Sequence, residues 1–318
     1  MRSGAATRRW SGDLRATRAA IVACLALALL LVPAGVAAQE LSPRAYWPAP
    51  VGTRVLVTGY AHASGDVLLD PTLPVYGVDS RISTFFLGYV ETFALGGRNA
   101  NLLLEAPYSW GATRGLLGDT PARTEFAGLN DLAATLSVNL LGAPALTTDE
   151  FAQLRAQPRP IVGVSFKLVP PTGYYHSDRF INVGSNRWAG RLQLGAMFPL
   201  RPRWLLELDA GAWLFGDDAD YPGGRREQDP IYAFEAHLVH RIRPGLWASF
   251  DVNAFVGGRQ TIDGEEREDL QRNTRLGATV AVPFLGRHVV KFGYSTAART
   301  RFGSDSEQLL LTYQFLIQ

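Results

Sequence analysis

The side chains best suited to chemistry in this 318-residue chain are a few polar residues that recur on predicted strands. Ser249 and Asn253 share a face with His237 of the preceding strand, and residues of these types can support ester hydrolysis. The polar lining of a watery interior uses the same residue types, and we favour that interpretation. His237 and His240 lie on opposite faces of a strand because they are three residues apart. We expect no metal site, no cofactor and no enzyme activity.

Sequence motifs of enzymes give the same indication. The chain has no Gly-x-Ser-x-Gly, Walker or His-Glu-x-x-His motif. The chain instead has charged residues in the middle of predicted strands, and these residues all lie on the same face of their strands. We predict that they line a pore, where rows of opposite sign would create a transverse field. The residues are Lys167, Arg191, Glu207, Asp209, Glu235, Arg241, Asp251, Arg275 and Lys291. The alternative is that these charges pair off and plug a narrow barrel.

The elements that position these charges are strands with one apolar face. In residues 204–214 every even position is apolar, and the odd positions include Glu207, Asp209 and Gly211. This period of two indicates β-strands with one apolar and one polar face. Twelve such strands are predicted, at about 53–64, 80–95, 98–112, 126–142, 159–170, 186–200, 203–216, 230–243, 245–258, 271–285, 287–299 and 305–318.

The length of these strands distinguishes a membrane barrel from a soluble sandwich. Each has ten or more residues, enough to cross an apolar band of about 25 Å when tilted, whereas strands of soluble proteins average about 5–6 residues. We therefore predict an all-β fold, a transmembrane antiparallel β-barrel of about 12 strands. Trp188, Trp204, Tyr232 and Tyr294 have the lipid-facing parity of an aromatic girdle. For hydrophobic solutes an inner apolar patch is expected, to which Phe166 or Leu168, Trp213 and Trp247 would contribute if they point inward.

The connections between the predicted strands alternate between short and long. Short turns fall at 96–98, 201–202, 243–245 and 286–287, and longer polar loops fall near 65–79, 112–125, 171–185, 217–229 and 259–270. This alternation is typical of a barrel with both termini in the periplasm. Residues 143–158 should be short but are not. There, Thr147 and Glu150 form a capping-box pattern that predicts a short periplasmic helix; a miscounted strand is the alternative.

The N-terminal residues indicate export. Residues 1–38 combine five arginines, an apolar run and a small-residue end, which predicts a signal peptide cleaved near Ala38–Gln39. Its removal takes five basic residues and one acidic residue, so the net charge changes from +2 to −2, and nucleic-acid binding is not expected. The only cysteine, Cys24, leaves with it. Residues 39–52 are predicted to be a periplasmic or lumenal segment, and residues 53–318 the barrel.

The expected partners follow from a location in the cell outer membrane. The last strand has Tyr313 and Phe315 in register, the kind of segment that barrel-insertion machinery reads, although the chain ends in Gln318. The acidic run Glu265–Asp269 and the cluster at Asp217, Asp218 and Asp220 lie in predicted outer loops. They could bind a cation that bridges lipopolysaccharide, although most such runs are merely solvated.

Several short motifs, taken in order along the chain, resemble the MetA-pathway of phenol degradation family. They are Pro43-Arg-Ala-Tyr46, Pro50-Val-Gly52, Ile181-Asn-Val-Gly-Ser-Asn-Arg-Trp188, Gln228-Asp-Pro230, Pro244-Gly-Leu-Trp247 and Gly257-Gly258. The residues carrying the resemblance most clearly are Asn182, Gly184, Asn186, Trp188, Gln228, Asp229 and Pro230. The resemblance implies an outer-membrane barrel linked to the uptake of aromatic compounds.

Together these observations predict a channel for passive uptake of small, aromatic or hydrophobic solutes. A structural or surface-binding barrel without transport is the main alternative, and an outer-membrane lipid hydrolase is a weaker one. A channel predicts conductance in lipid bilayers, a hydrolase predicts turnover lost with Ser249 or His237, and a structural barrel predicts neither.

Overall fold

The computed structural model describes residues 43–66, 76–117, 120–179, 181–300 and 305–317. The predicted signal peptide and the first residues of the 39–52 segment lie outside the described residues. No helix in the described part of the chain has the length and apolarity needed to cross a membrane.

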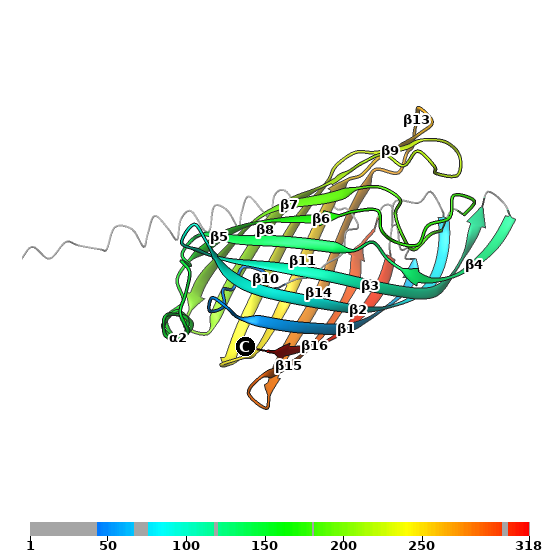
Figure 1. The fold of residues 1–318 in the computed structure, drawn as a ribbon. Helices are drawn as coiled ribbons and strands as arrows, with labels where there is room; N and C mark the ends of the chain where they lie inside the picture. Colours follow the sequence, from blue (N-terminus) through cyan, green and yellow to red (C-terminus); the bar gives the residue numbers. More distant parts are fainter. Residues whose placement is uncertain (1–42, 67–75, 118–119, 180, 301–304, 318) are drawn as a thin grey trace, which may run out of the picture. The chain divides into compact units, whose positions relative to one another are not determined.

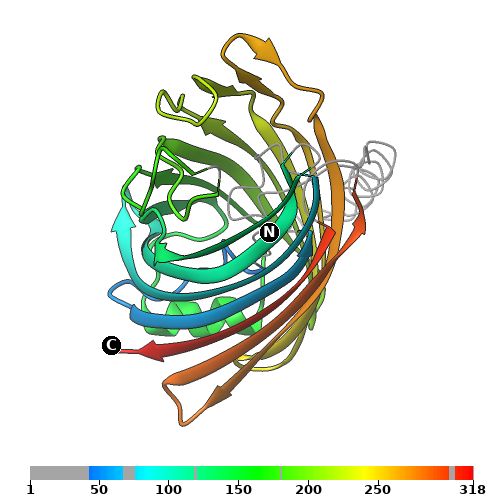
Figure 2. The ribbon, with the colours of Figure 1, turned by 90° about the vertical axis from the view of Figure 1, so that its right-hand side faces the viewer.

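Antiparallel strands form a closed twelve-strand barrel (Figures 1 and 2). In chain order the barrel strands are β1 (Arg54–Asp66), β2 (Tyr76–Leu95), β3 (Arg98–Leu117), β4 (Thr120–Leu129), β5 (Ala133–Leu141), β6 (Ile161–Val169), β7 (Ala189–Arg201), β8 (Trp204–Phe215), β10 (Ile231–Arg243), β11 (Leu246–Gly257), β14 (Gln271–Phe284), β15 (His288–Arg299) and β16 (Asp305–Leu316). β4 and β5 both pair with β3 and share one position.

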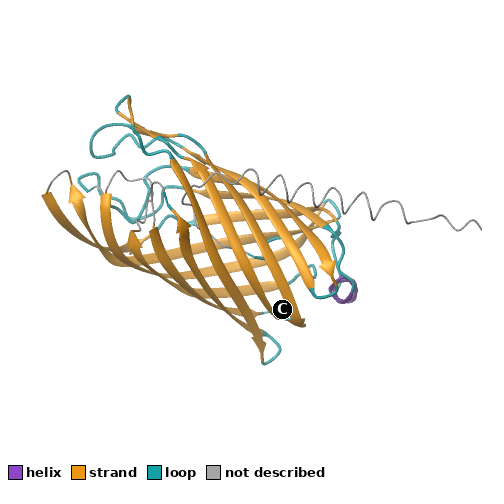
Figure 3. Cartoon of the chain, turned by 180° about the vertical axis from the view of Figure 1, so that it is seen from behind, coloured by secondary structure: helices purple, strands orange, loops and turns teal. Residues whose placement is uncertain are grey.

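The first and last strands close the ring. Thr58 of β1 lies opposite Leu87 of β2 on one side and opposite Tyr313 of β16 on the other. Figure 3 shows the tilted strands from behind. A closed ring satisfies the backbone hydrogen bonds between strands, which lipid cannot do. The predicted fold and strand number are confirmed.

One predicted strand is interrupted. We expected a continuous strand at 126–142, but residues 130–132 separate β4 from β5. Within this break, the Asp131 carboxylate accepts hydrogen bonds from the Gly173 and Ser185 amides at 2.7 and 2.8 Å. Beyond this break, β3 and β4 extend as a hairpin in which β4 pairs only with β3 among the described strands.

The two ends of the barrel differ in their connections. The turn end carries the short turns near 96–97, 202–203, 244–245 and 285–287 and the segment 142–160. The loop end carries the longer connections, including a small sheet of β9 (Arg226–Gln228), β12 (Gln260–Ile262) and β13 (Glu265–Glu266). That sheet was not predicted, because strands of two or three residues have no detectable periodicity.

The outer surface of the barrel is apolar. Leu192, Leu194, Phe234 and Phe250 each expose more than half of their surface. In water such a surface would be unfavourable, but in a bilayer it contacts acyl chains.

Aromatic side chains mark both borders of this surface. Trp110 packs near Tyr60 and Tyr108 at the loop end, with ring centroids 6.1 and 6.2 Å apart. At the turn end, the Trp204 ring lies 4.4 Å from His240. The four aromatic residues predicted for the girdle, Trp188, Trp204, Tyr232 and Tyr294, are all exposed. Such paired belts are typical of membrane–water interfaces.

The predicted helix forms as α2 (Thr148–Ala156) at the turn end (Figure 1). The Thr147 hydroxyl accepts from the Glu150 amide at 3.3 Å, and the Glu150 carboxylate accepts from the Thr147 amide at 2.8 Å, so the capping box is complete. Leu154 is buried in an apolar cluster with inward-facing side chains of the barrel strands, among them Ile161, Leu205 and Trp247. The helix therefore packs against the inside of the barrel at this end.

Loss of the capping box should loosen this helix without unfolding the barrel. For Thr147→Ala we expect about 1 kcal/mol of local destabilisation, because the Glu150 amide loses its acceptor, the Thr147 hydroxyl. Hydrogen exchange of residues 148–156 should be faster, with the barrel unchanged. The matched control is Thr148→Ala, an exposed neighbour that should exchange as the native protein does. Equal protection in both variants would contradict this account of the cap.

Candidate functional site

The inner face of the barrel carries the charged residues predicted for the pore. Arg191, Glu207, Asp209, Glu235, Asp251 and Arg275 are buried, each with at most 8% of its surface exposed. Lys167, Arg241 and Lys291 are intermediate. All nine therefore point away from the apolar outer surface. That they line a conducting pore stays a prediction.

Four of these residues form an acidic group on adjacent strands. Asp209 of β8 lies opposite Glu235 of β10, and Glu207 lies opposite His237, which in turn faces Asp251 of β11. Like charges directly opposite each other are unfavourable, so this arrangement needs cations nearby.

Basic residues stand next to this acidic group on β6 and β7. Lys167 lies opposite Arg191 in the register of these strands. The Arg191 guanidinium donates to Oε1 of Glu235. The Lys167 ammonium is 3.0 Å from Oε2 of Glu105, a residue that was not among those predicted to line the pore. The predicted rows of opposite sign thus do lie side by side on the inner face.

Two predicted pore residues belong elsewhere. Arg275 donates to Ser306 Oγ at 3.2 Å and Ser295 Oγ at 3.1 Å, towards the loop end. Arg241 donates to the carbonyl oxygens of Arg155 in α2 and of Pro202 at the turn end. Both therefore connect neighbouring segments of the chain and lie apart from the acidic group.

The residues considered for a hydrolase, Ser249, Asn253 and His237, are all buried on the inner face of β10 and β11. Nδ1 of His237 is 2.8 Å from Oδ1 of Asp251, and its Nε2 faces Asp209 and Glu235. The Ser249 hydroxyl makes no hydrogen bond. His237 is therefore held towards carboxylates, with neither ring nitrogen bonded to the serine.

Of the aromatic and apolar residues expected inside, two are there and two are not. Trp247 is buried, and Trp213 packs on an inner cluster with Ile231 and Phe255. Phe166 and Leu168 are 49% and 37% exposed on the outer surface, so neither contributes to an inner patch. The reason is parity, since the residue between them, Lys167, points inward.

The N-terminal segment packs against the inner face of β6–β8. From the sequence, both a periplasmic and a lumenal position had been expected for it. The Tyr46 hydroxyl lies 3.0 Å from Ser165 Oγ and donates to the Gln193 carbonyl oxygen at 3.3 Å. Its ring fills the space above Gly163 and Gly195, where an added Cβ would lie 2.3 and 2.0 Å from ring atoms. Glycines at these positions thus form a slot for the ring.

Arg44 gives this segment its second attachment. Its amide donates to Oε2 of Glu207 at 2.6 Å, and its guanidinium lies over the Trp47 and Trp247 rings at 4.4 and 5.4 Å. Burial lowers the pKa of Arg44 to about 10, with Glu207 acting in the opposite direction. Arg44 is therefore still charged at neutral pH and adds a cation beside the acidic group.

The residues that carried the family resemblance meet at the loop end, in loops that are far apart in sequence. The side chain of Asn182 accepts a hydrogen bond from the backbone amide of His176 and donates one to the His176 carbonyl oxygen. These two bonds join the ends of this loop. Gly184 lies against Gly173 so closely that an added Cβ would be 2.7 Å from its carbonyl carbon. Asn186, with a positive φ of 55°, donates to Oδ1 of Asp218 at 2.8 Å.

The second group of motif residues joins the next loops. The Arg187 guanidinium donates to Oε1 of Gln228 at 2.5 Å, and the Gln228 amide donates to the Gly258 carbonyl oxygen at 3.1 Å. The Asp229 amide bonds the Arg259 carbonyl oxygen, and the Pro230 carbonyl oxygen accepts from the Gly258 amide. Trp188 points outward and is 56% exposed. Apart from Trp188, these motif residues hold the outer loops together.

Three of the acidic loop residues considered for cation binding, Asp217, Asp218 and Glu266, are paired with arginines. Asp218 is fully buried and lies 3.6 Å from the Arg226 guanidinium. Asp217 pairs with Arg225, and Glu266 pairs with Arg259. Asp269 accepts from the Gln260 amide and side chain, and burial raises its pKa. Bridging to lipopolysaccharide through these groups stays a prediction.

Asp218 is the residue on which the loop network depends most. Asp218→Ala removes the acceptor for Asn186 and Tyr175 and leaves the buried Arg226 without its carboxylate. Breaking a buried pair from one side typically costs about 3–5 kcal/mol. We expect at least tenfold faster proteolysis within residues 171–188 and 217–229. Asp220→Ala is the control, because the hydrogen bonds described for Asp220 use its backbone. Equal cleavage of both variants would contradict this role.

A closed barrel with an apolar outer surface and a charged inner face is a transmembrane β-barrel of the outer-membrane type. Residues 61–309 match the family described as MetA-pathway of phenol degradation. The chain belongs to this family, and the resemblance drawn from the loop motifs is confirmed.

A solved structure of an outer membrane channel shows the same fold. The chain is similar to an outer membrane channel from Pseudomonas putida F1, with a TM-score of 0.72 and 23% identity, covering 87% of this chain and 100% of that one. Weaker likenesses are the transport unit of the autotransporter AIDA-I from Escherichia coli (TM-score 0.48, 10% identity, 87% and 92% covered) and the NanC porin (0.46, 6%, 82% and 98%). No curated protein matches the chain.

Proposed function

We propose that the protein is a channel of the outer membrane that takes up small aromatic or hydrophobic solutes by passive diffusion. The observation that carries this proposal is the barrel itself, whose outer surface is apolar and whose inner face carries charged groups of both signs. A charged inner face needs water or ion pairs, and a wall with rows of both signs is typical of diffusion pores. The structural likeness to an outer membrane channel supports the same reading.

An aromatic shelf near the loop end supports the solute class. The rings of Trp213 and Phe215 are stacked at an interplanar angle of 11°, with centroids 6.4 Å apart. The Arg187 guanidinium lies 4.6 Å from the Phe215 ring, and Arg191 lies 5.8 Å from Trp213. The indole Nε1 of Trp213 is buried and makes no hydrogen bond. Flat rings and nearby guanidinium groups suit an aromatic solute with an anionic or hydroxyl group.

Removing this shelf should change flux in a solute-dependent way. For Trp213→Ala we expect slower entry of an aromatic acid such as benzoate into proteoliposomes, and unchanged or faster entry of a small sugar, because only the aromatic solute loses a stacking surface. Tyr232→Ala, an exposed aromatic on the lipid side, is the matched control and should leave both rates unchanged. Equal effects on benzoate and sugar would contradict the aromatic preference.

The same assays separate the alternatives. A structural or surface-binding barrel would show no flux of either solute in correctly folded protein. A hydrolase would turn over lipid esters and lose that activity with Ser249→Ala.

We propose an outer-membrane location reached by export and cleavage of residues 1–38 and by recognition of the last strand by the insertion machinery. Mass spectrometry of protein from isolated outer membranes tests it, and an intact N-terminus would contradict the cleavage.

A further inference from the structure

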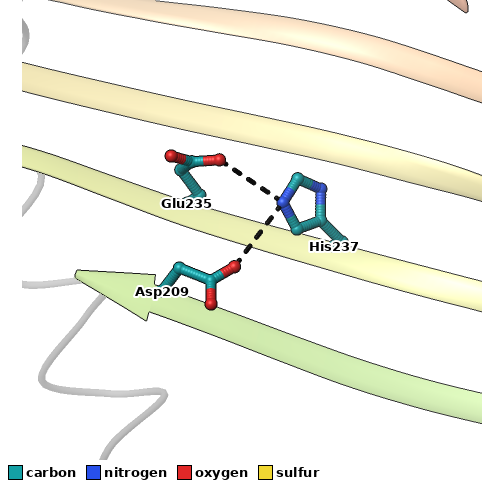
Figure 4. A group of neighbouring side chains, drawn as sticks. All are labelled: Asp209, Glu235 and His237. Carbon is teal, nitrogen blue, oxygen red and sulfur yellow. Dashed lines mark ion pairs between the residues drawn. The ribbon is translucent and has the colours of Figure 1, made fainter. Parts of the chain in front are cut away.

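Three ligand-type side chains meet on the inner face at β8 and β10. Asp209 and Glu235 are direct cross-strand neighbours, and His237 lies two residues from Glu235 on the same face. Each exposes no more than 8% of its surface. Figure 4 shows both carboxylates directed towards one ring nitrogen of the histidine. One atom from each residue lies within 4.8 Å of the other two.

Contacts on the Nδ1 side of the ring fix the orientation of His237. Nδ1 of His237 is 2.8 Å from Oδ1 of Asp251, and Oδ2 of that carboxylate accepts from the Thr279 hydroxyl at 2.9 Å. A carboxylate can only accept, so Nδ1 carries the hydrogen. The other nitrogen, Nε2, is fully buried, makes no hydrogen bond and points at the two carboxylates. A histidine that binds a metal usually donates its second N–H to a carboxylate in this way.

The distances favour an ion between the groups over direct hydrogen bonds. Nε2 lies 3.6 Å from Oε2 of Glu235 and 3.8 Å from Oδ2 of Asp209, beyond the usual range of a hydrogen bond. Bonds of about 2.0–2.2 Å to a tetrahedral Zn²⁺ place ligand atoms roughly 3.4 Å apart. The Arg191 guanidinium donates to the other oxygen of Glu235, Oε1. This bond keeps the Glu235 carboxylate in an orientation in which Oε2 faces His237.

We propose that Nε2 of His237, a carboxylate oxygen of Asp209 and Oε2 of Glu235 bind one divalent transition-metal ion of the Zn²⁺ type. The ion relieves the repulsion between the two facing carboxylates. The imidazole ligand selects against Ca²⁺, which takes oxygen ligands. Three protein ligands leave a fourth position open for water or an anionic solute group. The site lies beside Tyr46 and Gly195, since an added Cβ at Gly195 would lie 2.1 Å from Oδ1 of Asp209.

Metal binding to the folded full-length barrel tests the site directly. Protein treated with a chelator and returned to metal-free detergent buffer is titrated calorimetrically with Zn²⁺ and, separately, with Ca²⁺. We expect one Zn²⁺ per chain and no Ca²⁺ at this site. His237→Gln and Asp209→Asn should each weaken Zn²⁺ binding by at least tenfold, and Asp251→Asn by about 10- to 100-fold through the histidine orientation.

The matched control is His240→Gln, a histidine of the same strand that stacks on Trp204 and should leave binding unchanged. Folding of each variant is checked by its heat-modifiable mobility on gels, and Asp209→Asn, which keeps the side-chain shape, replaces His237→Gln if the latter does not fold. A Co²⁺-loaded native protein should show visible absorption bands that Asp209→Asn lacks. Absence of Zn²⁺ binding in the native protein, or equal binding in the Asp209 and His240 variants, would overturn the proposal.

Discussion

Gly195→Ala is expected to raise the single-channel conductance several-fold by expelling Tyr46 from the inner face. The new Cβ would lie 2.0 Å from the Tyr46 ring, a distance that atoms cannot adopt. Overpacking of this kind costs about 1–3 kcal/mol, roughly a 5- to 150-fold shift from the seated to the released segment. Since the segment occupies space among the inward side chains, its release should widen the path for ions. Recording in planar lipid bilayers measures the effect.

The control for this experiment lies on the same strand. A Cβ added at Gly190 would meet nothing closer than 3.5 Å, so Gly190→Ala should conduct like the native protein. Tyr46→Ala should resemble Gly195→Ala, because it removes the ring and its contacts with Ser165 and Gln193. If the Gly195 and Tyr46 variants both keep the native conductance, the N-terminal segment does not restrict the pore.

Leu194→Arg is expected to lower the stability of the barrel in the membrane. Leu194 lies near the middle of β7 and exposes 54% of its surface on the outer face. An arginine at the bilayer midplane of a barrel costs about 2–4 kcal/mol. We therefore expect the midpoint of denaturant-induced unfolding in lipid vesicles to fall, and less barrel to be inserted in outer membranes. Leu194→Met, which keeps an apolar side chain of similar volume, should behave as the native protein does.

The outcome that would contradict the outer-face assignment is equally specific. If Leu194→Arg and Leu194→Met unfold at the same denaturant concentration in vesicles, this surface does not contact acyl chains. A loss of stability that appears in detergent but not in lipid would point to packing, not to the bilayer.

The strands and their two faces could be predicted from the sequence, because apolar and polar residues alternate along each strand according to whether they face the outside or the inside of the barrel. Trp204 to Leu214 shows this most clearly, and the charged residues at its odd positions do face inward. The helix at 148–156 could also be predicted, since Thr147 and Glu150 are close in sequence and bond locally. Both features depend on neighbours within a few residues.

The clusters could not be predicted in the same way, because they depend on which strands are adjacent and in what register. Comparing His237 with His240 along one strand argued against a metal site, whereas the relevant neighbours are Asp209 and Asp251 on the flanking strands. Tyr46 is more than a hundred residues from Gly163 and Gly195, whose missing side chains make room for it. Asp131 looked like an ordinary strand residue until its partners Gly173 and Ser185 were known.

Recording of ionic current through the native barrel in a planar lipid bilayer tests the central claim most directly. The account predicts discrete conductance steps on addition of folded protein, with ion selectivity that changes when inward charges such as Lys167 or Glu105 are neutralised. Folded, membrane-inserted protein that remains electrically silent, even with Tyr46 replaced by alanine, would show that the charged inner face is a sealed interior and not a conduit.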